Sequence, residues 1–198
     1  MDIEMLMALK DKFATSKREI VVLSPNSQNI DKIKAIWAIP EKSLLGAIVF
    51  ETGGIIFDGW VRVLGCGERN IADWNNKLKL GNVLIVADDI LGGLFGLEME
   101  TSMIHYFAPD TLAWEDLDFT YSEFIRWLSE GDVDMFYEPF KWDGWVDDVK
   151  KLTIDEGFSY FPPLWTAESK TDTNRKIVPL EEIVLLSFEY QKQLDAKN

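Results

Sequence analysis

The sequence contains few of the side chains that most often carry out chemistry or cross-link a fold. Its 198 residues include one cysteine, Cys66, and one histidine, His105. One cysteine cannot form an internal disulfide bond, which excludes the disulfide-stapled scaffolds of small secreted domains. A zinc site of the Cys/His type would need more of these residues than the chain has, and a catalytic triad would have to use His105.

Neither residue stands in a context that favours catalysis. His105 lies between Ile104 and Tyr106 in a strand-like run, and strand alternation places it on the face opposite those two side chains. We interpret it as a structural histidine. Cys66 has no base beside it in the sequence, and we interpret it as a buried, inert thiol. We therefore expect no catalytic residue and no metal site.

Long apolar runs and cofactor motifs are also missing. The longest apolar run, Leu44–Phe50, has seven residues, far fewer than the ~20 needed to cross a bilayer. The start, MDIEMLMALKDKF, lacks the basic and apolar regions of a signal peptide. The glycines of GGLFG at 92–96 do not have dinucleotide-binding spacing, and no phosphate-binding loop occurs. We expect a soluble, cytoplasmic protein without a cofactor or a membrane partner.

The composition is that of one globular domain spanning residues 1–198. Hydrophobic residues make up 47% of the chain and aromatic residues 13%. This content is enough for a packed core, and it excludes a disordered chain. No internal repeat, low-complexity tract or long linker divides the sequence.

Negative charge is the dominant surface property. The net charge is −14. Between residues 110 and 156, fourteen acidic residues oppose four basic ones, a local net charge of −10 against −4 for the rest. Such a field repels nucleic acid and anionic membranes and attracts a basic protein. The candidate partner-binding residues are Asp110, Glu115, Asp116, Asp118, Asp132 and Asp134.

Each of these features also has a plainer interpretation. The acidic residues can be the solvated faces of surface helices. The tryptophans among them, Trp114, Trp127, Trp142 and Trp145, fit a binding patch or, more simply, the edge of a core. The pairs Asp88-Asp89 and Glu115-Asp116 could bind a hard cation or act as an acid/base pair, but we favour solvated turn acids.

The periodicity predicts short strands, some of them joined as hairpins, and several helices. The expected strands are 19–23, 55–58, 60–64, 83–87, 94–98 and 103–107; the expected helices are 2–14, 30–37, 71–78, 121–130, 133–138 and 179–194. Thr120 and Glu123 form a capping box at the start of the fourth helix. Residues 44–50 fit a helix or a strand, 110–120 reads as an acidic connection, 158–165 as a packed loop and 167–176 as an exposed polar segment.

The chain resembles a bacterial family of uncharacterised proteins over most of residues 40–190. The matching phrases are LGAIVFETGG (45–54), GWVRVLG (59–65), ADWN (72–75), VADDILGGLFGL (86–97), YFAPDTLAWEDL (106–117), YSEFIRW (121–127), WDGW (142–145) and residues 161–166. Family members usually carry a longer loop rich in glycine and asparagine after Leu97, where this chain has EMETSM. A site formed by that loop would be absent here.

The order of these phrases is also distantly similar to the SUKH (Syd/Knr-like) superfamily of immunity proteins. That similarity implies an α+β fold with a twisted, mostly antiparallel sheet, here of about five or six short strands, flanked by helices. It also implies toxin-neutralising binding, and it supplies no catalytic residue. Our first hypothesis is thus a non-enzymatic protein-binding module, an immunity protein against a basic, nuclease-type toxin. The alternatives are a small-molecule or metal-dependent enzyme using Asp88, Asp89, Asp110 and Glu115, and a structural or regulatory protein without a ligand.

Overall fold

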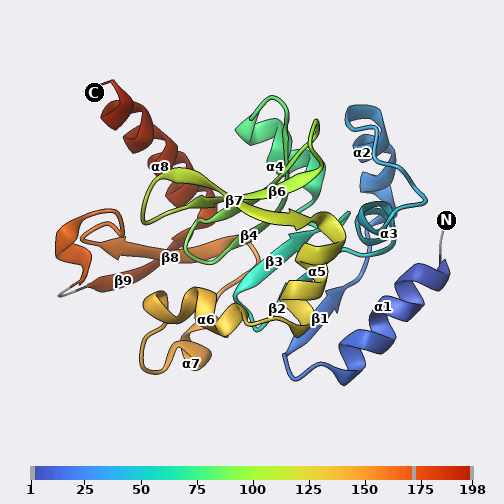
Figure 1. The fold of residues 1–198 in the computed structure, drawn as a ribbon, viewed down its shortest axis with the longest axis horizontal. Helices are drawn as coiled ribbons and strands as arrows, with labels where there is room; N and C mark the ends of the chain where they lie inside the picture. The colour runs from blue at the N-terminus through green and yellow to red at the C-terminus, as the bar shows by residue number, and fades with distance from the viewer. Residues whose placement is uncertain (1–2, 171–172, 197–198) are drawn as a thin grey trace.

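The structure, a computed structural model, describes residues 3–170 and 173–196 (Figure 1). Within them the chain is α+β, with a seven-stranded antiparallel sheet and a separate two-stranded one. The large sheet follows chain order: β1 (Ile20–Leu23), β2 (Gly54–Phe57), β3 (Val61–Leu64), β4 (Val83–Asp89), β5 (Leu94–Glu98), β6 (Met103–Ala108) and β7 (Ala113–Thr120). The small sheet pairs β8 (Glu156–Phe161) with β9 (Asn174–Pro179).

Helices lie before, between and after the strands. They are α1 (Ile3–Thr15), α2 (Ile30–Ile36), α3 (Leu44–Glu51), α4 (Ile71–Leu78), α5 (Tyr121–Glu130), α6 (Val133–Tyr137), α7 (Trp145–Val149) and α8 (Leu180–Asp195), with 3₁₀ turns at Ser27–Asn29, Glu138–Phe140 and Ala167–Lys170. The helices α1, α2 and α3 gather at one end of the molecule, while α8 and the β8–β9 pair occupy the other (Figure 1). No helix in the described ranges is long and apolar enough to cross a membrane.

The large sheet has a different covering on each face. On one face, Phe57 packs against Phe13 of α1, and Phe95 packs against Phe124 of α5. On the other face, Phe107 packs against Phe188 of α8, and β8 contacts the same helix. The register assigns side chains to these faces, because paired residues of adjacent strands point the same way. Val61 and Asp89 share the first face, and Arg62, Asp88, Leu94 and Phe107 follow one another across the second.

The buried side chain of Asn75 repairs an irregularity in the central strand. The register of β4 against β5 shifts between Ile85 and Ala87, as at a β-bulge. Asn75, on α4, accepts a hydrogen bond from the Ile85 amide (2.7 Å) and donates to the carbonyls of Ile85 and Ile71 (both 2.8 Å). Its amide therefore satisfies backbone groups that the distorted ladder leaves in the core.

Most of the helices and strands agree with the sequence prediction. Segment 44–50, which was ambiguous, is helical, and its amide-capping residue is Ser43. The capping box of Thr120 and Glu123 is present. Both of these helix starts follow the expected rule that a short polar side chain satisfies a free amide of the first turn.

The prediction of five or six strands was too low. The acidic connection 110–120 contains the edge strand β7, in which a bulge interrupts the alternation and Asp118 has a φ of 54°. The first half of the packed loop predicted at 158–165 belongs to β8, and the polar segment 167–176 leads into β9. These three segments lack a clean period of two because each is largely exposed or lies in a small two-stranded sheet.

Replacing Asn75 with alanine tests the repair of β4. The substitution leaves the buried amide and carbonyl of Ile85 without partners, so we expect unfolding to become easier by roughly 2–4 kcal/mol. The neighbouring Asn76 is exposed, and Asn76→Ala should cost less than about 0.5 kcal/mol. Urea denaturation of both variants measures the difference, and equal losses would contradict the assignment.

Candidate functional site

The centre of the molecule holds two adjacent aspartates that point to opposite faces of the sheet. Asp88 and Asp89 end β4, and both are fully buried. The sequence interpretation of this pair as solvated turn acids is therefore wrong. Burying a carboxylate costs several kcal/mol unless it is paired and hydrogen-bonded. The partners of each aspartate therefore determine whether it stabilises the fold.

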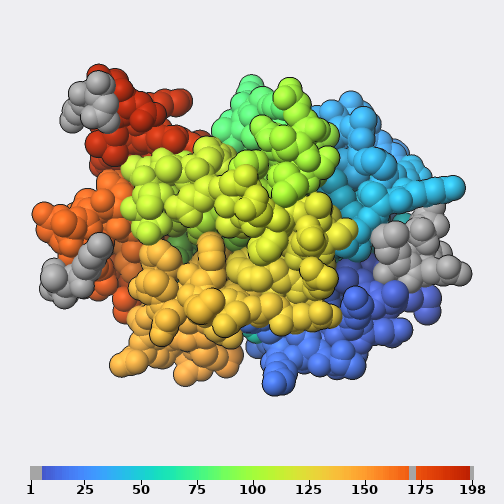
Figure 2. Space-filling view, viewed as in Figure 1, coloured from blue at the N-terminus to red at the C-terminus, as the bar shows by residue number. Residues whose placement is uncertain are grey.

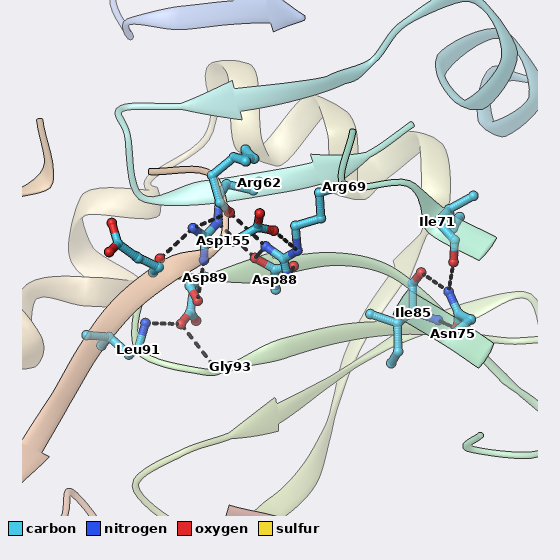
Figure 3. A network of polar contacts seen from close by, with 12 residues as sticks. Arg62, Arg69, Ile71, Asn75, Ile85, Asp88, Asp89, Leu91, Gly93 and Asp155 are labelled. Carbon is cyan, nitrogen blue, oxygen red and sulfur yellow. Dashed lines mark hydrogen bonds and ion pairs between the residues drawn. The ribbon is translucent and has the colours of Figure 1, made fainter. Parts of the chain in front are cut away.

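Asp88 is held by two buried arginines (Figure 3). Arg62 Nε donates to its Oδ1 at 2.9 Å, and the Arg69 guanidinium approaches both oxygens, with Nη2 2.5 Å from Oδ2. Arg62 Nη1 also donates to the carbonyls of Ile154 (2.9 Å) and Glu156 (2.7 Å). Burial lowers the pKa of Arg62, and Asp88 opposes that change. The pair of arginines thus ties the segment before β8 to the sheet.

Asp89 is held by neutral donors. Its Oδ1 accepts from the amides of Leu91 (2.8 Å) and Gly93 (2.9 Å). Its Oδ2 accepts from the hydroxyls of Tyr106 (2.7 Å) and Tyr137 (2.9 Å). Burial raises the pKa of the Asp89 carboxyl, and the four hydrogen bonds oppose this because they favour the ionised form. Burial also raises the pKa of both tyrosines, which keeps them protonated as donors.

Gly93 is required at this turn because a Cβ there would collide with the Asp89 carboxylate and the Tyr106 hydroxyl. The four charged groups Arg62, Arg69, Asp88 and Asp89 cancel, which leaves no net charge in the core. Neither aspartate lines the large cleft of the molecule. The arrangement supports the fold and leaves no room for a substrate at either carboxylate.

That large cleft lies on the second face of the sheet, beside the network. Its volume is about 560 Å³. One wall consists of side chains from β1, β2 and β3, and the other consists of residues 146–154. Its lining includes Val21, Ile56, Leu64, Val149 and Leu152, with Arg62 and Arg69 at the buried end. Apolar clefts of this size are the usual form of ligand and peptide sites.

The six predicted partner-binding acids fall into two groups. Glu115, Asp116 and Asp118 are exposed on β7, and Asp110 lies in the turn before it. Asp132 and Asp134 belong to α6 and are engaged within the fold. Asp132 accepts from the Met135 amide as helix cap, while Asp134 pairs with Lys141 and, at 3.4 Å, with Arg18. Lys141 lowers the pKa of Asp134.

The four carboxylates of the enzyme hypothesis do not share a cleft. Asp88 and Asp89 are enclosed in separate networks, whereas Glu115 is exposed on an edge strand. In the described ranges, no three His, Cys, Asp or Glu residues are placed to hold a metal ion. His105 faces Glu98 at 3.6 Å. Cys66 is buried, as its sequence interpretation expected.

The tryptophans of the acidic segment belong to the edge of the core. Trp114, Trp127, Trp142 and Trp145 are partly buried against it. Trp142 and Trp145 both contact the buried ring of Trp60. Lys141 lies 4.5 Å from the Trp145 ring centre, and Arg175 lies 4.5 Å from that of Trp142. These cations keep the exposed ring faces occupied from within the chain.

The partners of the aspartates were not predicted from the sequence: they are Arg62, Arg69, Tyr106 and Tyr137. One signal was available, since an arginine inside the apolar run VRVL needs a buried acid as its partner. Nothing local connects Tyr137 to Asp89, because the hydrogen bond joins residues 48 positions apart.

We predict that Asp88→Asn is far more destabilising than Asp155→Asn. Both carboxylates approach Arg69, but Asp88 is 0% exposed and Asp155 is 73% exposed at 3.8 Å. Loss of the buried charge leaves two arginines uncompensated and should cost roughly 3–5 kcal/mol, whereas the exposed pair should contribute less than about 1 kcal/mol. The urea midpoints of the two variants measure this difference in stability. Similar midpoints would contradict the claim that the buried charge of Asp88 stabilises the core.

Comparison with known proteins agrees with the resemblance found in the sequence. Over 166 residues the chain is 36% identical to the uncharacterised protein YbfG of Escherichia coli (strain K12), covering 78% of this chain and 76% of that protein. Over 142 residues it is 38% identical to an uncharacterised protein of Haemophilus influenzae, covering 64% of this chain and 62% of the relative. Residues 3–183 match the family described as protein of unknown function DUF2625. The chain belongs to the DUF2625 family.

Proposed function

We propose that this chain is a non-catalytic protein-binding module whose partner is a basic protein. The observation that carries the proposal is the row of exposed acids on the edge strand β7. Glu115, Asp116 and Asp118 form no ion pair with any described residue, and β7 lies uncovered at the front of the molecule (Figure 2).

Acids elsewhere on the surface differ in this respect. Asp73 pairs with Lys32, Asp134 with Lys141 and Asp148 with Lys151. The lysine partner lowers the pKa of each of these carboxylates. The charge on β7 has no such internal partner, so its field is directed outward, where it attracts cationic surfaces.

The partner class follows from this field. A nuclease-type toxin has a basic surface because it must bind nucleic acid. We therefore propose an immunity function, in which the acidic strand covers such a surface, and a relationship to the SUKH superfamily. The α+β fold with its antiparallel sheet supports that relationship. A cytoplasmic location is part of the proposal, since a toxin directed at nucleic acid must be neutralised there.

Charge on an edge strand also protects a sheet from pairing with other sheets. Protection of the edge requires no partner, so a binding experiment distinguishes this role from partner binding. If the genome encodes a nuclease-type toxin domain beside this chain, that domain, inactivated at its active site, is the probe; absence of such a neighbouring gene would itself count against the immunity proposal.

We expect that Glu115→Lys, Asp116→Lys and Asp118→Lys together slow association with this probe by at least roughly tenfold at low salt, because charges at the rim of an interface act mainly on the association rate. The matched control reverses three exposed acids elsewhere, Glu130, Asp143 and Glu189, and should change the rate much less. Stopped-flow mixing at two salt concentrations measures both rates.

Failure to form a complex with the probe would remove the immunity proposal. A complex whose association rate is the same in both triple variants would remove β7 as the contact surface. Urea denaturation of each triple variant shows that the comparison is made between folded proteins.

A further inference from the structure

The opposite edge of the large sheet has a different character. Strand β1 pairs only with β2, so its outer side is open within the described residues. The mouth of the 560 Å³ cleft lies beside this edge. An open strand edge next to an apolar pocket is the arrangement by which many domains bind an extended peptide.

The register identifies which backbone groups of β1 face outward. The Asp58 amide donates to the Glu19 carbonyl, and the Gly53 amide donates to the Leu23 carbonyl. In an antiparallel pair the inward-bonding residues alternate, so Glu19, Val21 and Leu23 bond toward β2. The amides and carbonyls of Ile20 and Val22 therefore point away from the sheet and can receive an added strand.

Side-chain exposure shows that the cleft opens at this edge. Along the sheet wall, Val21 on β1 is 43% exposed, whereas Leu64 on β3 is 3% exposed. Along the facing wall, Val146 is 47% exposed and Val149 is 7% exposed. The mouth thus lies between Val21 and Val146. A strand added to β1 would place alternate side chains at this mouth, with apolar space behind it.

The charges around the cleft indicate the chemistry of the occupant. The two arginines at its buried end share Asp88, and Arg69 also pairs with Asp155 at 3.8 Å. Both arginines donate to backbone carbonyls as well, so they do not require an anionic ligand. Lys150 at the rim pairs with Asp147 at 3.5 Å. Glu19 and Glu68, also in the lining, are exposed, and neither has a cationic group of a described residue within 4.0 Å. The unpaired rim charge is negative.

We propose that β1 and this cleft form a binding site for an extended peptide segment in which every second side chain faces the cleft, with apolar residues at the centre of this row and a basic residue at each end. The segment pairs with the outward groups of Ile20 and Val22. Its apolar side chains enter the cleft past Val21, and its basic side chains lie near Glu19 and Glu68. This site is at the opposite edge of the sheet from β7 and does not rest on the function proposed for that strand.

The test uses a fluorescently labelled nine-residue peptide with lysine at positions 1 and 9, valine at positions 3 and 7, tryptophan at position 5 and serine at the even positions, so that the lysines and the apolar side chains lie on the same face of the strand. Anisotropy measures its affinity for the full chain. Val22→Pro removes one outward amide while leaving the inward ladder intact, a position where proline is tolerated in an edge strand. We expect it to weaken binding by roughly tenfold. Val22→Ala keeps the amide and should bind within about twofold of the original.

A second pair of variants tests the mouth without touching the strand backbone. Val21→Lys should weaken binding by roughly tenfold, because it places a cation where an apolar group must pass. Leu185→Lys is the control, since Leu185 on α8 is 45% exposed and lies outside the cleft lining. It should leave the affinity unchanged.

Three results would overturn the proposal. The first is that a scrambled peptide of the same composition binds as tightly as the designed peptide. The second is that Val22→Pro and Val22→Ala have equal affinities for the designed peptide. The third is a loss of peptide binding when only the acids of β7 are reversed. Self-association through β1 that the proline variant abolishes, without peptide binding, would assign the edge to a second copy instead. Thermal unfolding of each variant identifies any that fail to fold. If Val22→Pro fails to fold, the comparison of Val21→Lys with Leu185→Lys decides the test.

Discussion

The structure depends on two adjacent carboxylates that the core encloses on opposite sides of one strand. Each requires a separate set of partners, because an unpaired buried charge would cost more than the net stability of a typical domain can absorb. Asp88 takes two guanidinium groups, and Asp89 takes two amides and two phenol hydroxyls. The strand β4 is therefore the element to which distant parts of the chain are attached.

These attachments determine the shape of the surface. Arg62 and Arg69 hold the carbonyls of Ile154 and Glu156, so residues 146–154 stand over β1, β2 and β3 at the distance that leaves the cleft. On the other side, Tyr137 brings α6 against the sheet, and its neighbour Phe136 packs on Trp127 of α5. The same ionic centre thus positions both the cleft and the helices that follow β7.

The two edges of the sheet illustrate two ways to handle unpaired backbone groups. Edge strand β7 carries exposed acids, which discourage pairing with another sheet. Strand β1 is short and apolar, and it lies beside a cleft that can receive side chains. An edge without charge, next to apolar space, invites an added strand, whereas an edge with unpaired acids favours contact through charge.

The sequence by itself determined the local structure. The glycine turns, the capping box at Thr120 and the helical spacing of α4, α5 and α8 each depend on interactions within a few residues, and the expected bounds agree with the structure. The family resemblance was also readable, because its phrases keep their order and spacing. The strands β7, β8 and β9 were not readable, since a bulge or exposure on both sides removes the alternation on which strand prediction depends.

Only the tertiary structure decided the roles of the charged residues. Asp88-Asp89 and Glu115-Asp116 are both adjacent acidic pairs in the sequence, yet the first pair is buried and fully engaged, whereas the second is exposed and forms no ion pair with a described residue. Similarly, Asp134 is neutralised by Lys141, while Asp118 has no ionic partner in the described ranges. The reason is physical: the state of a carboxylate depends on burial and on donors brought from positions far along the chain, and no local pattern encodes either.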